Sequence, residues 1–100
     1  MKKTKPEDIC EISSNFILEY TKTFQKLLSK YLSDREAICN ALYLLSKDGS
    51  LPKKYRTHKL TGNFQGYWEA HIKSDLLIIW EKEDGIITLI GIGTHAELFE

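Results

Sequence analysis

The feature that most limits the fold is a pair of apolar runs joined by a two-residue turn. Residues 75–83 read DLLIIWEKE, and residues 86–93 read IITLIGIG. Asp84-Gly85 lies between them, and this dipeptide favours the tight turn of a β-hairpin. The first run is almost continuously apolar, which is typical of a central strand. The sequence therefore predicts a hairpin in the middle of a sheet.

Two further segments show the period of two that indicates a strand. These are residues 15–21, NFILEYT, and residues 66–72, GYWEAHI. In the later segment, successive side chains point to opposite faces, so His71 lies on the face opposite Ala70.

Between these strands, residues 21–31 and 33–49 carry apolar residues at helical spacing. Ser33 and Glu36 fit a capping box at the start of the second helix, and Gly49 is a natural stop. The order β-α-α-β-β-β, followed by a short C-terminal turn of helix, predicts an α+β fold. We expect a two-layer sandwich, with the N-terminal strand and two helices packed on a mostly antiparallel sheet. The other face of the sheet is left for a ligand.

Length and composition indicate one domain in the cytoplasm. One hundred residues make a single domain, which we place at residues 14–100 behind a polar N-terminal extension at residues 1–13. No apolar run approaches the roughly 20 residues that span a bilayer, and none follows the N-terminal lysines as in a signal peptide. We therefore expect a cytoplasmic protein with no membrane partner. In that compartment Cys10 and Cys39 are expected to be free thiols, with Cys39 buried.

The charge is balanced over the whole chain but not locally. Fourteen basic and fourteen acidic residues give a formal net charge of zero, which argues against a protein that coats nucleic acid by bulk charge. Residues 47–73 nevertheless contain six basic side chains and only two acidic ones. This stretch predicts a local basic patch or, alternatively, an ordinary solvated loop.

The last ten residues, GIGTHAELFE, predict a capped turn of helix. Thr94 and Glu97 fit a capping box, so the turn would run from about His95 to Phe99. His95 would then lie at a helix start, where backbone N–H groups favour an anion. The simpler alternative is a structural turn that pins the last strand through Leu98 and Phe99.

All three histidines lie in the second half of the chain. His71 and Asp75 are expected near one another across a turn at residues 73–74. His95 would lie beside them, with His58 on the rim. Histidine moves protons near neutral pH and basic residues hold phosphate, so this set suits metal-free cleavage of a phosphodiester, especially in RNA. Two alternatives stay open at this point: a zinc site of three histidines and an aspartate, and purely structural roles.

Residues 52–99 carry motifs that resemble the YafQ branch of the RelE toxin superfamily. The stretches THKLTGNFQGYWEAHIKSDLLIIW and GIGTHAELF follow the pattern of that family at compatible spacing. The matching positions are His58, Leu60, Gly62, Ala70, His71, Ile72, Asp75, Gly93, Thr94, His95, Leu98 and Phe99. The resemblance implies a RelE-like α+β sandwich, with which the β-α-α start is compatible.

The resemblance also implies a function. It implies a type II toxin that cleaves messenger RNA on the ribosome, with an antitoxin of the DinJ or RelB kind, carrying an acidic C-terminal segment, as its partner. The activity would be that of an endoribonuclease without metal or other cofactor, in which the RNA 2′-hydroxyl attacks the adjacent phosphate.

Roles for individual residues follow from the same resemblance. His95 would be the general acid that protonates the leaving oxygen. His71 and Asp75 would form the general-base or positioning pair, and His58 would contact phosphate or assist proton transfer.

The expected RNA contacts lie around these residues. Phe99 would pack against or stack on a base, a contact worth about 1–3 kcal/mol in single-strand binders. Three cations of the basic stretch would bind RNA from the rim: Lys54, Arg56 and Lys59.

Two departures from the family pattern affect the expected activity. The arginine that begins the last motif is Gly91 here, and Ser74 and Leu76 replace a proline and an aromatic residue beside Asp75. Loss of a donor aimed at developing charge costs about 10²–10³ in rate. We therefore expect reduced activity or a substitute cation, with Arg56 the favoured substitute. The departures leave an alternative function open: a catalytically weak protein that binds the ribosome or an antitoxin.

Overall fold

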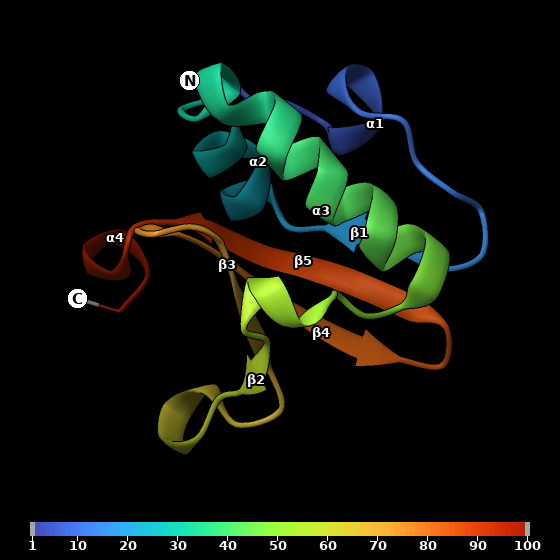
Figure 1. Ribbon diagram of the computed structural model, residues 1–100. Helices are drawn as coiled ribbons and strands as arrows, with labels where there is room; N and C mark the ends of the chain where they lie inside the picture. Colours follow the sequence, from blue (N-terminus) through green and yellow to red (C-terminus); the bar gives the residue numbers. More distant parts are fainter. Residues whose placement is uncertain (1, 100) are drawn as a thin grey trace.

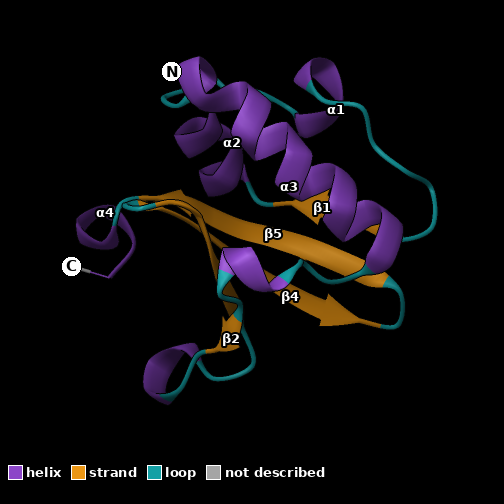
Figure 2. Ribbon diagram, in the orientation of Figure 1, coloured by secondary structure: helices purple, strands orange, loops and turns teal. Residues whose placement is uncertain are grey.

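The computed structural model describes residues 2–99, in which helices cover one face of a five-stranded sheet (Figures 1 and 2). The strands are β1 (Ile17–Tyr20), β2 (His58–Lys59), β3 (Trp68–Lys73), β4 (Leu76–Glu83) and β5 (Ile86–Gly93). Their order across the sheet is β1-β5-β4-β3-β2. β1 runs parallel to β5, and all other neighbours are antiparallel. The predicted α+β class with a mostly antiparallel sheet is confirmed.

The predicted hairpin is the centre of this sheet. β4 lies between β5 and β3, and its residues 76–80 are all buried. Asp84 and Gly85 both have positive φ, of 52° and 80°, as the tight turn between β4 and β5 requires.

The helices are α1 (Pro6–Ile9), α2 (Lys22–Leu28), α3 (Arg35–Asp48) and α4 (His95–Phe99). Three short 3₁₀ helices are η1 (Leu32–Asp34), η2 (Lys53–Tyr55) and η3 (Gly62–Phe64). Gly49 ends α3 in the left-handed conformation, as predicted. The predicted capping box at the start of α3 is wrong, because Ser33 lies inside η1 and Asp34 takes the N-cap position without a side-chain hydrogen bond.

The core lies between the helix layer and the sheet. Phe24 and Leu28 of α2 and Ile38, Leu42 and Leu45 of α3 have no exposed surface. They belong to one cluster with side chains of the sheet, namely Ala70, Ile78, Trp80, Ile87, Leu89 and Ile92. This packing fixes the strands that carry the candidate site. In residues 2–99, no helix has the length and apolar character needed to cross a bilayer.

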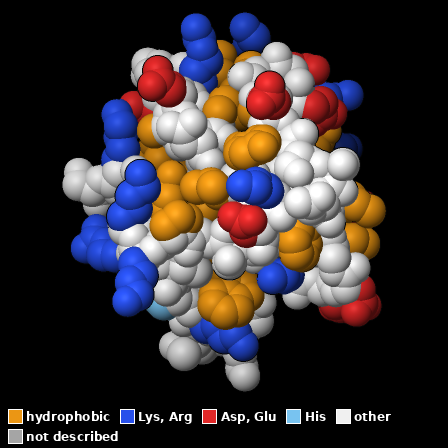
Figure 3. All heavy atoms as spheres, turned by 45° about the vertical axis from the view of Figure 1, so that its right-hand side comes forward, with side chains coloured by type: hydrophobic (Ala, Val, Ile, Leu, Met, Phe, Trp, Pro, Cys, Tyr) orange, Lys and Arg blue, Asp and Glu red, His pale blue; other side chains and the backbone are white. Residues whose placement is uncertain are grey.

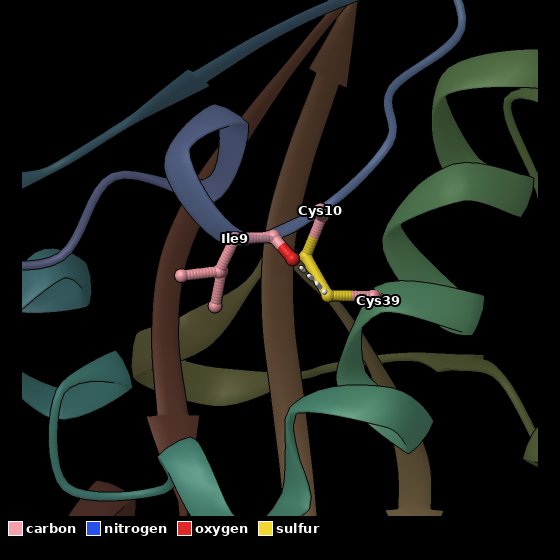
Figure 4. Close-up of a disulfide and its surroundings, with 3 residues drawn as sticks. All are labelled: Ile9, Cys10 and Cys39. Atoms are coloured by element: carbon pink, nitrogen blue, oxygen red, sulfur yellow. Dashed lines mark hydrogen bonds between the residues drawn. A yellow bond between two sulfur atoms is a disulfide. The ribbon is translucent and has the colours of Figure 1, made fainter.

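The two cysteines form a disulfide, so the prediction of free thiols is wrong (Figure 4). α1 packs against α3 and brings Cys10 opposite Cys39, with 5.1 Å between their Cα atoms. Cys39 is half-buried. The two cysteines are 29 positions apart in the sequence, so their spacing does not reveal this proximity.

The N-terminal segment packs on the domain, which its interpretation as a polar extension did not anticipate. Thr4 and Pro6 are buried, and the Thr4 backbone N–H donates to the Gln25 carbonyl at 3.1 Å. The apolar Pro6 and Ile9 give this segment a face that can pack. Met1 begins the predicted extension and Glu100 ends the predicted domain. Both residues lie outside the described residues.

The turn-rich stretch between α3 and β3 contains the two-residue strand β2, which the sequence did not predict. β2 adds to the edge of the sheet by pairing with β3, with His58 opposite Glu69 and Lys59 opposite Trp68. This pairing brings the basic stretch against the strand that carries His71.

Candidate active site

Glu69 is the buried carboxylate at the centre of the candidate site. It lies on the same face of β3 as His71, two residues away, and its side chain is 5% exposed. Its Oε1 atom is 3.2 Å from His58 Nε2 and 3.9 Å from His71 Nε2. The Glu69 carboxylate therefore orients the rings of both His58 and His71, because both rings direct their Nε2 atom toward it. No role was predicted for Glu69, although strand alternation puts it on the face of His71.

Arg56 contacts the other ring nitrogen of His71. The residue follows η2 in the left-handed conformation, and its Nη2 is 3.3 Å from His71 Nδ1. A guanidinium can only donate, so His71 Nδ1 accepts and the ring proton lies on Nε2, toward Glu69. His71 is thus held as a neutral imidazole whose Nδ1 lone pair accepts from the Arg56 guanidinium.

The electrostatics of His71 agree with this arrangement. Burial lowers the pKa of His71, and the charge of Arg56 lowers it further, while Glu69 opposes the shift. The neighbouring His58 and His95 also lower this pKa. A lowered pKa leaves the imidazole unprotonated at neutral pH, which is the state that a general base needs.

His58 has hydrogen-bond acceptors at both ring nitrogens. Its Nδ1 is 3.3 Å from the carbonyl oxygen of Arg56, and its Nε2 faces Glu69. His58 is 53% exposed and lies at the rim, as predicted.

Asp75 contacts His95 and not His71, so the predicted pairing of His71 with Asp75 is wrong. Asp75 lies in the turn at residues 74–75, one residue later than predicted, because Lys73 still belongs to β3. Its Oδ1 atom accepts from the His95 backbone N–H at 3.4 Å and lies 3.6 Å from His95 Nδ1. Each of the two histidines therefore has its own carboxylate.

The predicted capping box of α4 is confirmed. The Thr94 N–H donates to Glu97 Oε1 at 3.1 Å, and the Glu97 N–H donates to Thr94 Oγ1 at 3.2 Å. Glu97 also accepts hydrogen bonds from Lys30 and Tyr31, which lie just after α2. These two donors lower the pKa of Glu97 to about 2, and burial together with Glu97 raises the pKa of Tyr31 to about 12. The helix that carries His95 is thereby anchored to the helix layer.

Aromatic rings close the site on the side of α4. The His71 and His95 ring centroids are 6.4 Å apart, and the Phe99 ring is 5.7 Å from that of His95. Phe64 of η3 packs edge-on against Phe99 at 5.1 Å. Phe64 was not predicted as a site residue, because only the folded loop brings η3 to α4.

The predicted RNA-binding cations do not all lie at the site. Lys54 lines a cavity together with His71. Lys59 instead lies over the Trp68 ring, 5.0 Å from its centroid. Lys73 is paired with Asp34. In the view of Figure 3, several Lys and Arg side chains gather along the left edge, close to the visible histidine.

Gly91 is covered by α4. A Cβ atom added to this glycine would lie 3.0 Å from Leu98 Cδ2, so a larger residue requires Leu98 to move. In residues 2–99, no group of three or more His, Cys, Asp or Glu residues is placed to hold a metal ion.

The fold and the family comparison place this chain among the bacterial toxins of type II toxin–antitoxin systems. Within that class it belongs to the YafQ family, whose model matches residues 15–100. The resemblance predicted from the motifs is confirmed. Residues 2–14, which include α1 and Cys10, precede the matched region.

Individual relatives support the same assignment. The mRNA interferase toxin YafQ of Escherichia coli K12 is 31% identical over 86 residues, covering 82% of this chain and 94% of that protein. The toxin in the E. coli DinJ–YafQ toxin–antitoxin complex is similar with a TM-score of 0.78 and 28% identity, over 86% of this chain and 99% of that one. A metal-bound toxin from Helicobacter pylori is similar with a TM-score of 0.75 and 28% identity, over 84% of this chain and 99% of that one.

Proposed function

We propose that this toxin is an endoribonuclease that cleaves messenger RNA on the ribosome in the cytoplasm. The observation that carries the proposal is the facing pair of histidines, His71 and His95, with ring centroids 6.4 Å apart and a separate carboxylate beside each. The name of the E. coli relative, mRNA interferase toxin, supports the same activity.

In the proposed reaction, the 2′-hydroxyl of one nucleotide attacks the phosphate that follows it. Arg56, which donates to His71 Nδ1 at 3.3 Å in the free protein, would turn to the phosphate oxygens, and the released Nδ1 would accept the hydroxyl proton. His95 donates a proton to the leaving 5′-oxygen. The O2′–P bond forms and the P–O5′ bond breaks, leaving a 2′,3′-cyclic phosphate and a 5′-hydroxyl. Proton transfer by a positioned histidine contributes about 10²–10⁴-fold to such a rate.

The surrounding residues would position the RNA. Glu69 and His58 hold His71, and Asp75 holds His95 at the start of α4. Phe99 offers its ring to a base, with Phe64 supporting it from behind. These are positioning roles, since none of these side chains exchanges the reacting proton.

The proposed partner is an antitoxin of the DinJ or RelB kind. The solved E. coli complex pairs the similar toxin with DinJ, and an acidic C-terminal segment of such an antitoxin would suit the cations at the site.

We further propose that cleavage needs no metal, although the similar H. pylori toxin was solved with a metal bound. Cleavage by purified toxin should survive EDTA when a matched control shows that the ribosomes are still intact. Purified protein with stoichiometric zinc, whose activity returns only with zinc, would contradict this part of the proposal.

Primer extension on a translated message tests the function. Wild type should cut the message, and His95→Ala should lower the rate of cleavage by about 10²–10⁴-fold. Glu83→Ala, an exposed change at the far end of β4, serves as the matched control and should cut like wild type. If wild type and His95→Ala both leave the message uncut, the nuclease proposal fails and the weakly catalytic binder takes its place.

A further inference from the structure

Two adjoining cavities form one groove that leads away from His71 along α3. The smaller cavity, about 210 Å³, includes His71 in its lining, and the larger, about 400 Å³, reaches Tyr43 and Cys39. Asn40, Lys54 and Tyr55 line both, so the two cavities adjoin. We refer to this combined depression as the α3 groove.

The groove offers a cation and an amide where the two cavities meet, and an aromatic ring in the larger cavity. Lys54 Nζ lies 5.4 Å from the centre of the Tyr55 ring and, among residues 2–99, has no carboxylate within ion-pair distance. Asn40 and Tyr43 are three residues apart on α3, so their side chains share one face of the helix. Asn40 is exposed. Tyr43 is 36% exposed, which is unusual for a large apolar residue of this protein.

These three groups match the phosphate, the base face and the base edge of a nucleotide. A lysine binds phosphate, a tyrosine ring stacks on a base, and an asparagine amide hydrogen-bonds to a base edge. Proteins that read single-stranded RNA combine stacking with contacts to the base edges in this way.

We propose that the α3 groove binds the nucleotide on the 5′ side of the cut and thereby contributes to the choice of cleavage site. This inference rests on the proposed function, because the direction follows from the reaction. His71 takes the proton from the 2′-hydroxyl, which belongs to the nucleotide upstream of the scissile phosphate. His71 lines the groove whereas His95, on the side of the leaving oxygen, does not. The upstream chain therefore enters the groove, with a phosphate at Lys54 and its base between Asn40 and Tyr43.

The charges favour RNA over an acidic peptide in this groove. Lys54 lines both cavities, His71 lines the smaller one, and Glu11 lines the larger one. A peptide with several carboxylates would meet Glu11, whereas a neutral base can lie there. Glu11 and the disulfide at Cys39 belong to a wall that the segment before the family match helps to build. Within this wall, Glu11 and Cys10 precede the region that the family model matches, whereas Cys39 lies inside it.

Binding of RNA to the full chain tests the groove independently of cleavage. The probe is a fluorescein-labelled single-stranded RNA hexamer of mixed sequence with 2′-O-methyl groups, which the proposed reaction cannot cut. Tyr43→Ala should weaken binding by about 5- to 100-fold, the range expected for one base–aromatic stack, and Tyr43→Phe should restore it. Lys47→Ala, exposed on the same helix outside the groove, should bind like wild type. Because Tyr43 is exposed, its variants should melt at the wild-type temperature.

A second readout addresses cleavage-site choice. The 5′ ends of fragments from translated messages should show a nucleotide preference immediately upstream of the cut, and Asn40→Ala should weaken that preference.

Three outcomes would overturn the inference. They are undetectable binding of the hexamer to wild type, wild-type affinity of Tyr43→Ala for it, or tighter binding of a glutamate-rich peptide that depends on Tyr43. Tyr43-dependent RNA binding by a wild-type protein that cuts no message would instead refute the proposed function and leave the groove as an RNA site.

Discussion

The two histidines of the proposed site are held in different ways. His71 lies inside β3, with a side chain 18% exposed, between the buried Glu69 carboxylate and the Arg56 guanidinium. His95 begins a five-residue helix after the last strand, and its side chain is 57% exposed beside an Asp75 that is 66% exposed. One histidine is fixed by the sheet and its burial, and the other depends on how α4 is anchored.

This difference suits the two tasks in the proposed reaction. The base must stay unprotonated, and burial next to a cation lowers the pKa of His71 as that requires. The acid must deliver a proton to an oxygen that departs with the downstream RNA, so it benefits from an open position at the edge of the site. The precision of His95 then depends on Glu97, which joins α4 to Lys30 and Tyr31.

Among substitutions of the residues around His71, that of Arg56 is expected to lower the cleavage rate most. Arg56→Ala should lower single-turnover cleavage by about 10²–10³-fold, because it removes a donor aimed at the charge that develops on the phosphate. Gly91→Arg alone should do little or reduce activity, since even a Cβ atom at this position lies 3.0 Å from Leu98 Cδ2. We propose that Arg56 has replaced the arginine expected at position 91.

The double variant Arg56→Ala with Gly91→Arg, made with and without Leu98→Ala, completes this test. Partial rescue once Leu98 is shortened would show that the two positions share one phosphate-binding role. An Arg56→Ala protein as fast as wild type would refute the role, and Lys54 would be the next cation to test.

A smaller effect should appear in the titration of His71. Burial and the charge of Arg56 lower its pKa, so the base form persists to lower pH than for an ordinary histidine. Arg56→Gln removes one cause of that shift, and the His71 pKa should rise. The rate should then fall at mildly acidic pH, where more of the base is protonated.

The measurement is an NMR titration of the imidazole signals in wild type, Arg56→Gln and the surface control Lys47→Gln. A His71 pKa that stays unchanged or falls in Arg56→Gln would contradict the assigned contact.

The smallest effect is on stability and concerns the anchor of His95. The folded pKa of Glu97 is lowered from 4.5 to about 2, first by its bond to Lys30 and then by Tyr31. Its ionised form therefore stabilises the fold fully above its ordinary pKa, and this contribution is lost as the pH falls toward 2. Glu97→Gln should lower the free energy of unfolding at neutral pH by about 1 kcal/mol.

Urea unfolding at neutral pH and near pH 3 measures this difference, with the exposed Glu81→Gln as the control. The difference in the free energy of unfolding between wild type and Glu97→Gln should be smaller near pH 3 than at neutral pH. A difference in the free energy of unfolding that is equal at both pH values would mean that the ionised carboxylate does not anchor α4.

The parts of the molecule that short-range rules govern were predictable from the sequence. Asp84-Gly85 specified the hairpin, Thr94 and Glu97 specified the cap of α4, and alternation placed His71 on the open face. Each of these depends on residues within a few positions of one another, where backbone geometry leaves little choice.

The parts that depend on distant segments could not be predicted in this way. The disulfide needs α1 to lie on α3, and the two-residue β2 is a strand only because β3 is beside it. The partner of Asp75 depends on a one-residue difference in the turn, which moves its carboxylate from His71 to His95. In each case the sequence showed the residue but not its neighbour.

The end groups of the RNA fragments test the central claim most directly. Fragments from a translated message should carry a 2′,3′-cyclic phosphate on one side of the cut and a 5′-hydroxyl on the other. His71→Ala and His95→Ala should each reduce these fragments by about 10²–10⁴-fold while melting like wild type. Fragments with 5′-phosphate and 3′-hydroxyl ends, or cleavage that is unaffected by both substitutions, would contradict an acid–base pair of His95 and His71.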